Sequence, residues 1–403
     1  MSATLDDYQW LVSDAAQPWL TRLQPELEGL ATPAMLKRLR KDLSAERVHL
    51  VVEQVELRQR AREKFSLADR MFFTRKGLEQ ATDELLANYK AARFPGAGVF
   101  LDYCCGIGGD LLSIAARGLT LGLDFDPICV IFALANREAA KLPHSICGVE
   151  CQHIGQQPPD KFSAWHCDPD RRVDGHRTTQ IDLCEPRLEV LDKLRERNPN
   201  AAIKLAPATE VPPHWWDVAE REWLGSRGEC RQQVAWFGAL TRYPGKHTAT
   251  VVAADGSSRT VVGSPSEAVS VARQLGQYVY EPHAAVLAAG LTGAMCREHG
   301  LEAVSAGVDY LTGDSPVADA ALAAFEVREV LPFDRKQLRG WCREHAIGRL
   351  EIKKRGFPLD PRQLRSEIIA KGDNEATLIL TPLEGHVRAV VAERCLHPLP
   401  PIR

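Results

Sequence analysis

The chain has 403 residues, of which 45% are hydrophobic and 26% charged, a composition typical of a soluble protein with more than one domain. Its formal net charge of −3 gives no overall attraction for nucleic acid, so any such attraction has to be local. The longest apolar runs, such as residues 284–296, are too short to cross a bilayer, and the amino terminus lacks the basic-then-apolar order of a signal peptide. We therefore expect a cytoplasmic protein.

The first predicted part is a helical segment over residues 1–93. Apolar residues recur there at spacings of three and four, the pattern of helices with one buried face, over 32–43, 45–65 and 76–94. The second of these stretches carries a cationic cluster, Arg58, Arg60, Arg62 and Lys64. A charge run on a helix is usually a solvated face, and a binding role is the alternative.

From Gly96 onward short apolar runs alternate with helical patterns. The predicted strands are 99–105, 119–126, 145–151, 162–168 and 201–207, and the helices between them are 109–118, 127–140 and 186–198. Strands that are apolar throughout and separated by helices predict a parallel sheet covered on both faces. An antiparallel addition is expected from residues 231–240 and from a hairpin that turns at Gly256 and Ser257.

The last part, residues 325–403, has a mixed α+β pattern. Its predicted order is strand 325–333, helix 335–345, strand 349–356, helix 361–369, and strands 376–382 and 386–395. Residues 326–403 hold 15 Lys and Arg against 11 Asp and Glu, a difference of +4. This part is therefore the basic one in an otherwise slightly acidic chain.

A glycine-rich turn follows the first predicted strand. Glycines 106, 108 and 109 permit a tight turn and keep side chains away from a ligand, and in a doubly wound sheet this turn borders the binding crevice. Leu111 stands where the third glycine of a pyrophosphate-binding loop is required, and no Walker Gly-Lys-Ser/Thr follows. Asp102 before the turn and Asp124 at the end of the second strand instead suit the amino group and the ribose of S-adenosylmethionine.

These residues resemble a known family. The run Asp102-x-Cys104-Cys105-Gly106-x-Gly108-Gly109, followed by Gly122-x-Asp124-x-Asp126-Pro127 and Ala133-x-x-Asn136, resembles the first two motifs of class I S-adenosylmethionine-dependent methyltransferases. Its spacing is most similar to that of the trimethylguanosine-synthase-like branch. The resemblance implies an α/β fold with a doubly wound, Rossmann-like sheet over residues 94–324. It implies cofactor contacts from the positions Asp102, Cys104, Gly106, Gly108, Asp124 and Phe125. The alternative is that Asp102 and Asp124 only cap neighbouring helices.

The loop after the fourth strand is the candidate catalytic site. Amino-methyltransferases that resemble this family carry Asp/Asn-Pro-Pro-aromatic there, and this chain has Asp168-Pro169-Asp170-Arg171. We expect Asp168 and Pro169 to orient the nucleophile and Arg171 to bind an anionic group of the substrate, as neighbouring Arg172 would. The missing second proline and aromatic put methylation of a base amine in doubt. The alternative for the arginines is an ion pair with Asp168 or Asp170.

Three further features of the sequence have possible functional roles. Trp215 and Trp216 follow the fifth strand and are either a stacking surface or packed side chains. The eleven cysteines are odd in number and form no Cys-x-x-Cys pair, so buried free thiols are expected, Cys104 and Cys105 included. His144, Cys147, Cys151 and His153 have the composition of a zinc site, but strand residues four apart lie roughly 13 Å apart. We expect no metal.

The carboxy-terminal part, residues 325–403, resembles the THUMP-like domains attached to methyltransferases of this kind. True THUMP domains bind RNA, so the resemblance implies an RNA substrate, with a stabilising appendage as the alternative. The sequence thus predicts a methyltransferase that uses S-adenosyl-L-methionine and acts on RNA. Two other readings stay open: a methyltransferase for a small molecule or protein, and a non-catalytic RNA-binding protein that retains the cofactor fold.

Overall fold

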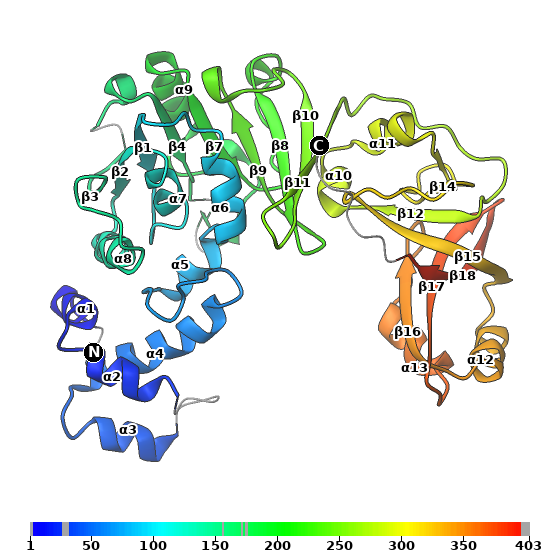
Figure 1. The fold of residues 1–403 in the computed structure, drawn as a ribbon, viewed down its shortest axis with the longest axis horizontal. Helices are drawn as coiled ribbons and strands as arrows, with labels where there is room; N and C mark the ends of the chain where they lie inside the picture. Colours follow the sequence, from blue (N-terminus) through cyan, green and yellow to red (C-terminus); the bar gives the residue numbers. More distant parts are fainter. Residues whose placement is uncertain (1–2, 26–31, 155–156, 171, 174–175, 396–403) are drawn as a thin grey trace. The chain divides into compact units, whose positions relative to one another are not determined.

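The computed structural model describes residues 3–25, 32–154, 157–170, 172–173 and 176–395 (Figure 1). The chain divides into two compact units, one made of Met1–Glu220 with Gln233–Pro244 and the other of Arg221–Gln232 with Gly245–Arg403. No helix among the described residues is long and apolar enough to span a membrane.

Six helices form the amino-terminal part of the first unit: α1 Leu5–Val12, α2 Gln17–Leu23, α3 Pro33–Leu39, α4 Ala45–Ala61, α5 Arg75–Gln80 and α6 Glu84–Ala91. Ser44 caps α4 by accepting a hydrogen bond from the Arg47 backbone N–H, and Thr74 caps α5 in the same way. Residues 76–94, predicted as one helix, form two. The helix breaks because Ala81 leaves the helical conformation and Asp83 begins a new N-cap.

The first unit also contains a mainly parallel sheet. Its strands and the helices between them are β1 Val99–Tyr103, α7 Leu111–Ala115, β2 Leu119–Asp124, α8 Pro127–Ala139, β3 Cys147–Cys151, β4 Ala164–Cys167, α9 Leu188–Arg197, β7 Ala201–Leu205 and β9 Glu229–Trp236. The short strands β5 Arg172–Val173 and β6 His176–Arg177 pair with each other in a separate sheet. The strand order is β9-β7-β4-β1-β2-β3, in which β9 is antiparallel to β7 and the others are parallel. The predicted doubly wound sheet is confirmed. The chain reverses its direction across the sheet between β1 and β4, and ligands bind at such a switch point, beyond the carboxyl ends of the strands.

The amino-terminal helices pack against α8 of this sheet (Figure 1). Phe132 on α8 contacts Tyr8 and Phe72, with ring centroids 5.8 and 5.9 Å apart, inside an apolar cluster that also holds α4. The helices therefore share a core with the sheet layer that borders the glycine turn.

The second unit contains β8 Glu220–Ser226, β10 His247–Val252, β11 Ser258–Gly263, β12 Tyr278–Pro282, α10 Ala284–Ala288, α11 Thr292–His299, β13 Glu302–Ala303, β14 Leu311–Gly313, β15 Leu322–Pro332, α12 Arg335–Glu344, β16 Ile347–Lys354, α13 Pro361–Ile368, β17 Asn374–Leu383 and β18 His386–Arg394. The hairpin predicted at Gly256 is present as β10 and β11. A seven-stranded sheet follows with the order β13-β14-β12-β15-β18-β17-β16. The element order predicted after residue 325 is confirmed.

Candidate functional site

A cavity of about 480 Å³ lies at the carboxyl ends of β1, β2 and β4. This volume falls within the range of roughly 300–1,000 Å³ that small-molecule sites occupy. The predicted site residues that line it are Asp102, Cys104, Gly106, Asp124, Phe125, Asp168 and Pro169. Residues from 74 to 82, in and around α5, line it as well.

Two predicted residues are not among the lining residues. Gly108 has a φ of +94°, which favours glycine, and it shapes the turn without bordering the cavity. Arg171 lies outside the described residues, and of Arg172 only the backbone is described. Their roles stay predictions.

The glycine turn opens toward the cavity at Gly106. Its φ is +55°, and a Cβ added there would meet no atom within 4 Å. Cys104, just after β1, also has a positive φ of 56°, an uncommon conformation for a residue with a side chain. The backbone is thus bent so that Gly106 leaves space on the ligand side.

Asp102 is the second-to-last residue of β1, and only one of its two carboxylate oxygens has a hydrogen-bond partner among the described residues. Its Oδ1 lies 2.7 Å from Nδ1 of His166 on β4, whereas its Oδ2 is buried and has no hydrogen-bond partner among the described residues. Burial raises the pKa of Asp102, and His166 opposes this rise. An unsatisfied buried carboxylate oxygen beside a cavity is costly unless a ligand donates to it.

Asp124 ends β2 and binds the glycine turn. Its Oδ2 accepts a hydrogen bond from the Gly106 N–H at 2.8 Å and its Oδ1 accepts one from the Asp126 N–H at 2.9 Å. A carboxylate has about four lone-pair sites, so two remain for ligand hydroxyl groups. Phe125 is 56% exposed beside it and stacks on His153, with ring centroids 5.9 Å apart.

The Asp168–Asp170 loop is held by lysines. Lys204 on β7 donates to Oδ2 of Asp168 at 2.5 Å and to the Gln80 carbonyl at 3.1 Å. Lys76 and Gln80 on α5 donate to Asp170 at 2.7 and 3.0 Å. The side-chain donors just named for both acids come from β7 and from the amino-terminal helices, which the sequence did not predict.

A buried network of charged side chains lies next to this loop and Asp102. Lys90 on α6 pairs with Asp110 at 2.6 Å, and Thr82 donates to the other Asp110 oxygen at 2.7 Å. The Nε2 atom of His166 lies 3.5 Å from Lys90 Nζ. Desolvation lowers the pKa of Lys90, while the attraction of Lys90 and His166 outweighs desolvation and holds the pKa of Asp110 well below its usual value.

The charged side chains that line the cavity fit a cationic ligand. Seven carboxyl residues and one lysine are among its described lining residues. Lys90, Lys204 and Lys76 neutralise Asp110, Asp168 and Asp170. The remaining acids are Asp102, Asp124, Asp126 and Glu185. This surplus suits an ammonium and a sulfonium group and opposes a pyrophosphate.

Asn136 on α8 connects the glycine turn to the amino-terminal helices. Its side-chain nitrogen donates to the Ile107 carbonyl at 2.8 Å and to the Phe72 carbonyl at 3.0 Å, and its oxygen accepts from the Phe72 N–H at 2.6 Å. Asn136 is wholly buried. It holds the turn against the segment between α4 and α5.

Of the other candidate residues, Trp215 and Trp216 do not line the cavity, whereas Cys105 and His153 do. Trp215 is fully buried and donates to Asp192, whereas Trp216 is 51% exposed. Cys105 is buried, and burial raises its pKa, as expected of a packing residue.

The predicted strand geometry around Cys147 and Cys151 is confirmed. Among the described residues, Glu298, His299 and Asp319 form the cluster compact enough to be compared with a metal site. Arg259 forms ion pairs with both acids of that cluster, so its single positive charge compensates one of their two negative charges.

Comparisons with known proteins agree with this fold. A family model described as THUMP domain-like matches residues 322–394, and a domain of unknown function (DUF8688) matches residues 4–61. The chain is 28% identical over 361 residues to an uncharacterized S-adenosylmethionine-dependent methyltransferase of Mycobacterium tuberculosis, found in strains CDC 1551 and H37Rv. That match covers 87% of this chain and 97% of the relative.

A solved structure shares the whole architecture. It is the "putative methyltransferase from Porphyromonas gingivalis W83", with a TM-score of 0.78 and 18% identity, over 98% of this chain and 100% of that one. The fold is that of a methyltransferase. The M. tuberculosis relatives, which are named S-adenosylmethionine-dependent methyltransferases, are similar to this chain over most of its length.

Proposed function

We propose that this enzyme binds S-adenosyl-L-methionine in the cavity beyond β1, β2 and β4 and transfers its methyl group to RNA. The observation that carries the cofactor part is the Asp102 carboxylate, which lines an acid-rich cavity and whose buried Oδ2 has no hydrogen-bond partner among the described residues. In the proposed complex Asp102 accepts from the cofactor's ammonium group and Asp124 accepts from its ribose hydroxyl groups. The open side of Gly106 leaves room for the methionine part.

The proposed catalytic part is the Asp168-Pro169 loop. The cofactor supplies the methyl group, and the protein has to orient the nucleophile and receive one proton. Asp168 would accept the hydrogen bond of the attacking group, with Lys204 fixing its carboxylate, and the Pro169 backbone would border the nucleophile. Arg171 would bind an anionic group of the substrate.

The RNA substrate rests on the THUMP domain-like match and on the basic balance of the carboxy-terminal part. We propose the same three parts that the sequence suggests: a helical segment to residue 93, a methyltransferase domain over 94–324 and a THUMP-like domain over 325–403. The trimethylguanosine-synthase-like branch and a cytoplasmic location belong to the same proposal.

Calorimetry tests the cofactor site. S-adenosylhomocysteine should bind the wild type and bind Asp102→Ala about 10- to 100-fold more weakly, since a hydrogen bond to a charged group contributes roughly 1.5–3 kcal/mol. Asp160→Ala is the matched control, because Asp160 is an exposed acid paired with Arg197 and lies outside the cavity. Equal affinity of all three proteins would contradict the assignment.

Label transfer tests the reaction. Tritium from the labelled cofactor methyl group should enter total cellular RNA with the wild type and not with Asp168→Ala. Label in the protein or small-molecule fraction alone would favour the second candidate class of substrate. RNA binding without transfer to any fraction would favour a non-catalytic protein. Mass spectrometry of nucleosides from cells with and without the protein would then identify the product.

A further inference from the structure

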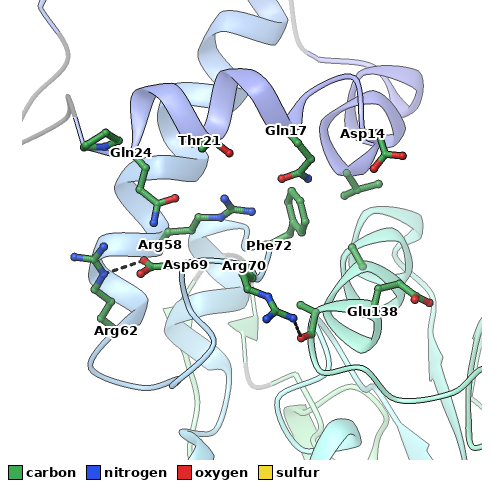
Figure 2. Close-up of a pocket in the computed structure, with 14 residues that line it drawn as sticks. Asp14, Gln17, Thr21, Gln24, Arg58, Arg62, Asp69, Arg70, Phe72 and Glu138 are labelled. Carbon is green, nitrogen blue, oxygen red and sulfur yellow. Dashed lines mark hydrogen bonds and ion pairs between the residues drawn. The ribbon is translucent and has the colours of Figure 1, made fainter.

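A second cavity, of about 700 Å³, lies in the first unit away from the cofactor site and is lined by α2, α4, the segment before α5 and the end of α8 (Figure 2). Three arginines border it: Arg58, Arg62 and Arg70. Two of them belong to the cationic cluster noted in the sequence, for which a solvated face was the usual expectation. That expectation is wrong for Arg58, which is only 3% exposed.

Arg58 is a buried cation without a direct acidic partner. Its Nε donates to the Met71 carbonyl at 2.9 Å, and its guanidinium lies 4.8 Å from the ring centre of Phe72. Among the described residues no carboxylate lies within ion-pair distance of it. Desolvation accordingly lowers its pKa to about 10. Burying a charge in this way costs several kcal/mol by order of magnitude unless an anion compensates it.

Of the three acids that line the cavity, Asp69 and Glu138 are paired with arginines, whereas Asp14 has no ion pair among the described residues. Asp69 accepts from Arg62 at 2.9 Å, and Glu138 accepts from Arg137 at 2.7 Å. Arg70 donates to the Ala139 carbonyl, an uncharged acceptor, so its charge also lacks a carboxylate among the described partners. Two guanidinium charges thus face one cavity without direct compensation.

Two uncharged amide side chains, Gln17 and Gln24, also line this cavity. Figure 2 shows the Arg58 guanidinium between the amide side chains of Gln17 and Gln24, which come from α2 and its end, while the Arg70 guanidinium is directed toward the end of α8. Donors that converge from several directions suit a tetrahedral oxyanion with three or more acceptor oxygens better than a planar carboxylate.

We propose that this cavity binds a phosphoryl group, held by Arg58 and Arg70 with amide support from Gln17 and Gln24. The site goes beyond the proposed methyl transfer and does not depend on it. Three sources share this chemistry: a free phosphate ion, a phosphate monoester such as a nucleotide, and the phosphodiester backbone of RNA.

Binding experiments on the full chain separate these sources. The probes are inorganic phosphate, adenosine monophosphate against adenosine, and a short oligoribonucleotide without terminal phosphate, each measured by thermal shift and calorimetry. The variants are Arg58→Gln and Arg70→Gln. Arg60→Gln is the matched control, because Arg60 is an exposed arginine on the same helix outside the cavity.

At least one phosphate-containing probe should raise the Tm of the wild type and of Arg60→Gln. Its affinity should fall about tenfold or more in Arg58→Gln and in Arg70→Gln. Because phosphate stabilises proteins nonspecifically, an equal shift in all four proteins overturns the proposal. So does the absence of binding by every probe. If Arg58→Gln fails to fold, the exposed Arg70 still provides the test.

Discussion

Lys90 and Asp110 form an ion pair of 2.6 Å between side chains that are 2% and 7% exposed. Removing one partner of such a pair leaves the other charge buried and unpaired, which costs more than the pair itself contributes. We expect Asp110→Asn to lower the free energy of unfolding by about 3–5 kcal/mol. Denaturant titration at neutral pH measures this loss. Asp160→Asn, which removes an exposed ion pair with Arg197, should change stability by less than about 1 kcal/mol.

The same aspartate gives a pH dependence. The pKa of Asp110 in the folded protein lies below its ordinary value of 3.8, so the unfolded chain takes up this proton first as the pH falls. Its contribution is therefore complete above about pH 4 to 5 and declines as the pH falls through the folded-state pKa. The stability difference between the wild type and Asp110→Asn should shrink in acid. A constant difference between pH 5 and pH 2 would contradict this assignment.

At the same scale the sequence predicts acids better than it predicts their partners. Asp102, Asp124 and Asp168 were predicted because each lies near the carboxyl end of a recognisable strand, and all three line one cavity. Lys90 and Lys204 were not predicted, because their role depends on contacts between residues that are far apart in the sequence. A polar residue within an otherwise buried strand, such as His166, was the available signal.

The glycine turn is the element whose shape sets the space for the cofactor. Gly106→Ala places a methyl group on the open side of the turn and forces a left-handed conformation on alanine, at a cost of about 1 kcal/mol. Gly300→Ala is the matched control, since Gly300 has a φ of +64° and equally open surroundings but caps α11. Both variants should lose similar stability in thermal melts. Only Gly106→Ala should lose affinity for S-adenosylhomocysteine, and a parallel loss in both would count against the proposed site.

Helix α5 could be predicted from its local sequence pattern, but its long-range contacts could not. Its helical periodicity was recognised, but its contacts with Asp170 and with the Lys204 that holds Asp168 were not. These contacts join residues 90 or more positions apart, and only the packed structure brings them together. Strand β8 was missed because its sequence, EREWLGS, begins with charged residues and lacks a clear apolar run. Two of them, Glu220 and Glu222, are fully buried.

For the whole molecule, the RNA proposal predicts a salt-dependent contribution from the carboxy-terminal part. Arg349 and Arg365 line one cavity of about 700 Å³ on that part. Filter binding of an oligoribonucleotide should weaken in Arg349→Glu/Arg365→Glu, and the salt dependence should become shallower by about 0.7 in log–log slope per lost contact. The control is Arg343→Glu/Arg362→Glu, which alters exposed arginines outside that cavity. Equal weakening in both double variants would indicate nonspecific charge repulsion.

The hydrogen bonds of Asn136 determine how far the chain can be shortened from its amino terminus. Its side chain bonds Phe72 on one side and Ile107 in the glycine turn on the other. A shortened protein starting at residue 94 would leave this amide without two of its three hydrogen bonds and would expose the apolar surface of Phe132 to water. The amino-terminal helices are therefore needed to keep the cofactor pocket intact. A truncation experiment would measure damage to that pocket and not the loss of a separate accessory module.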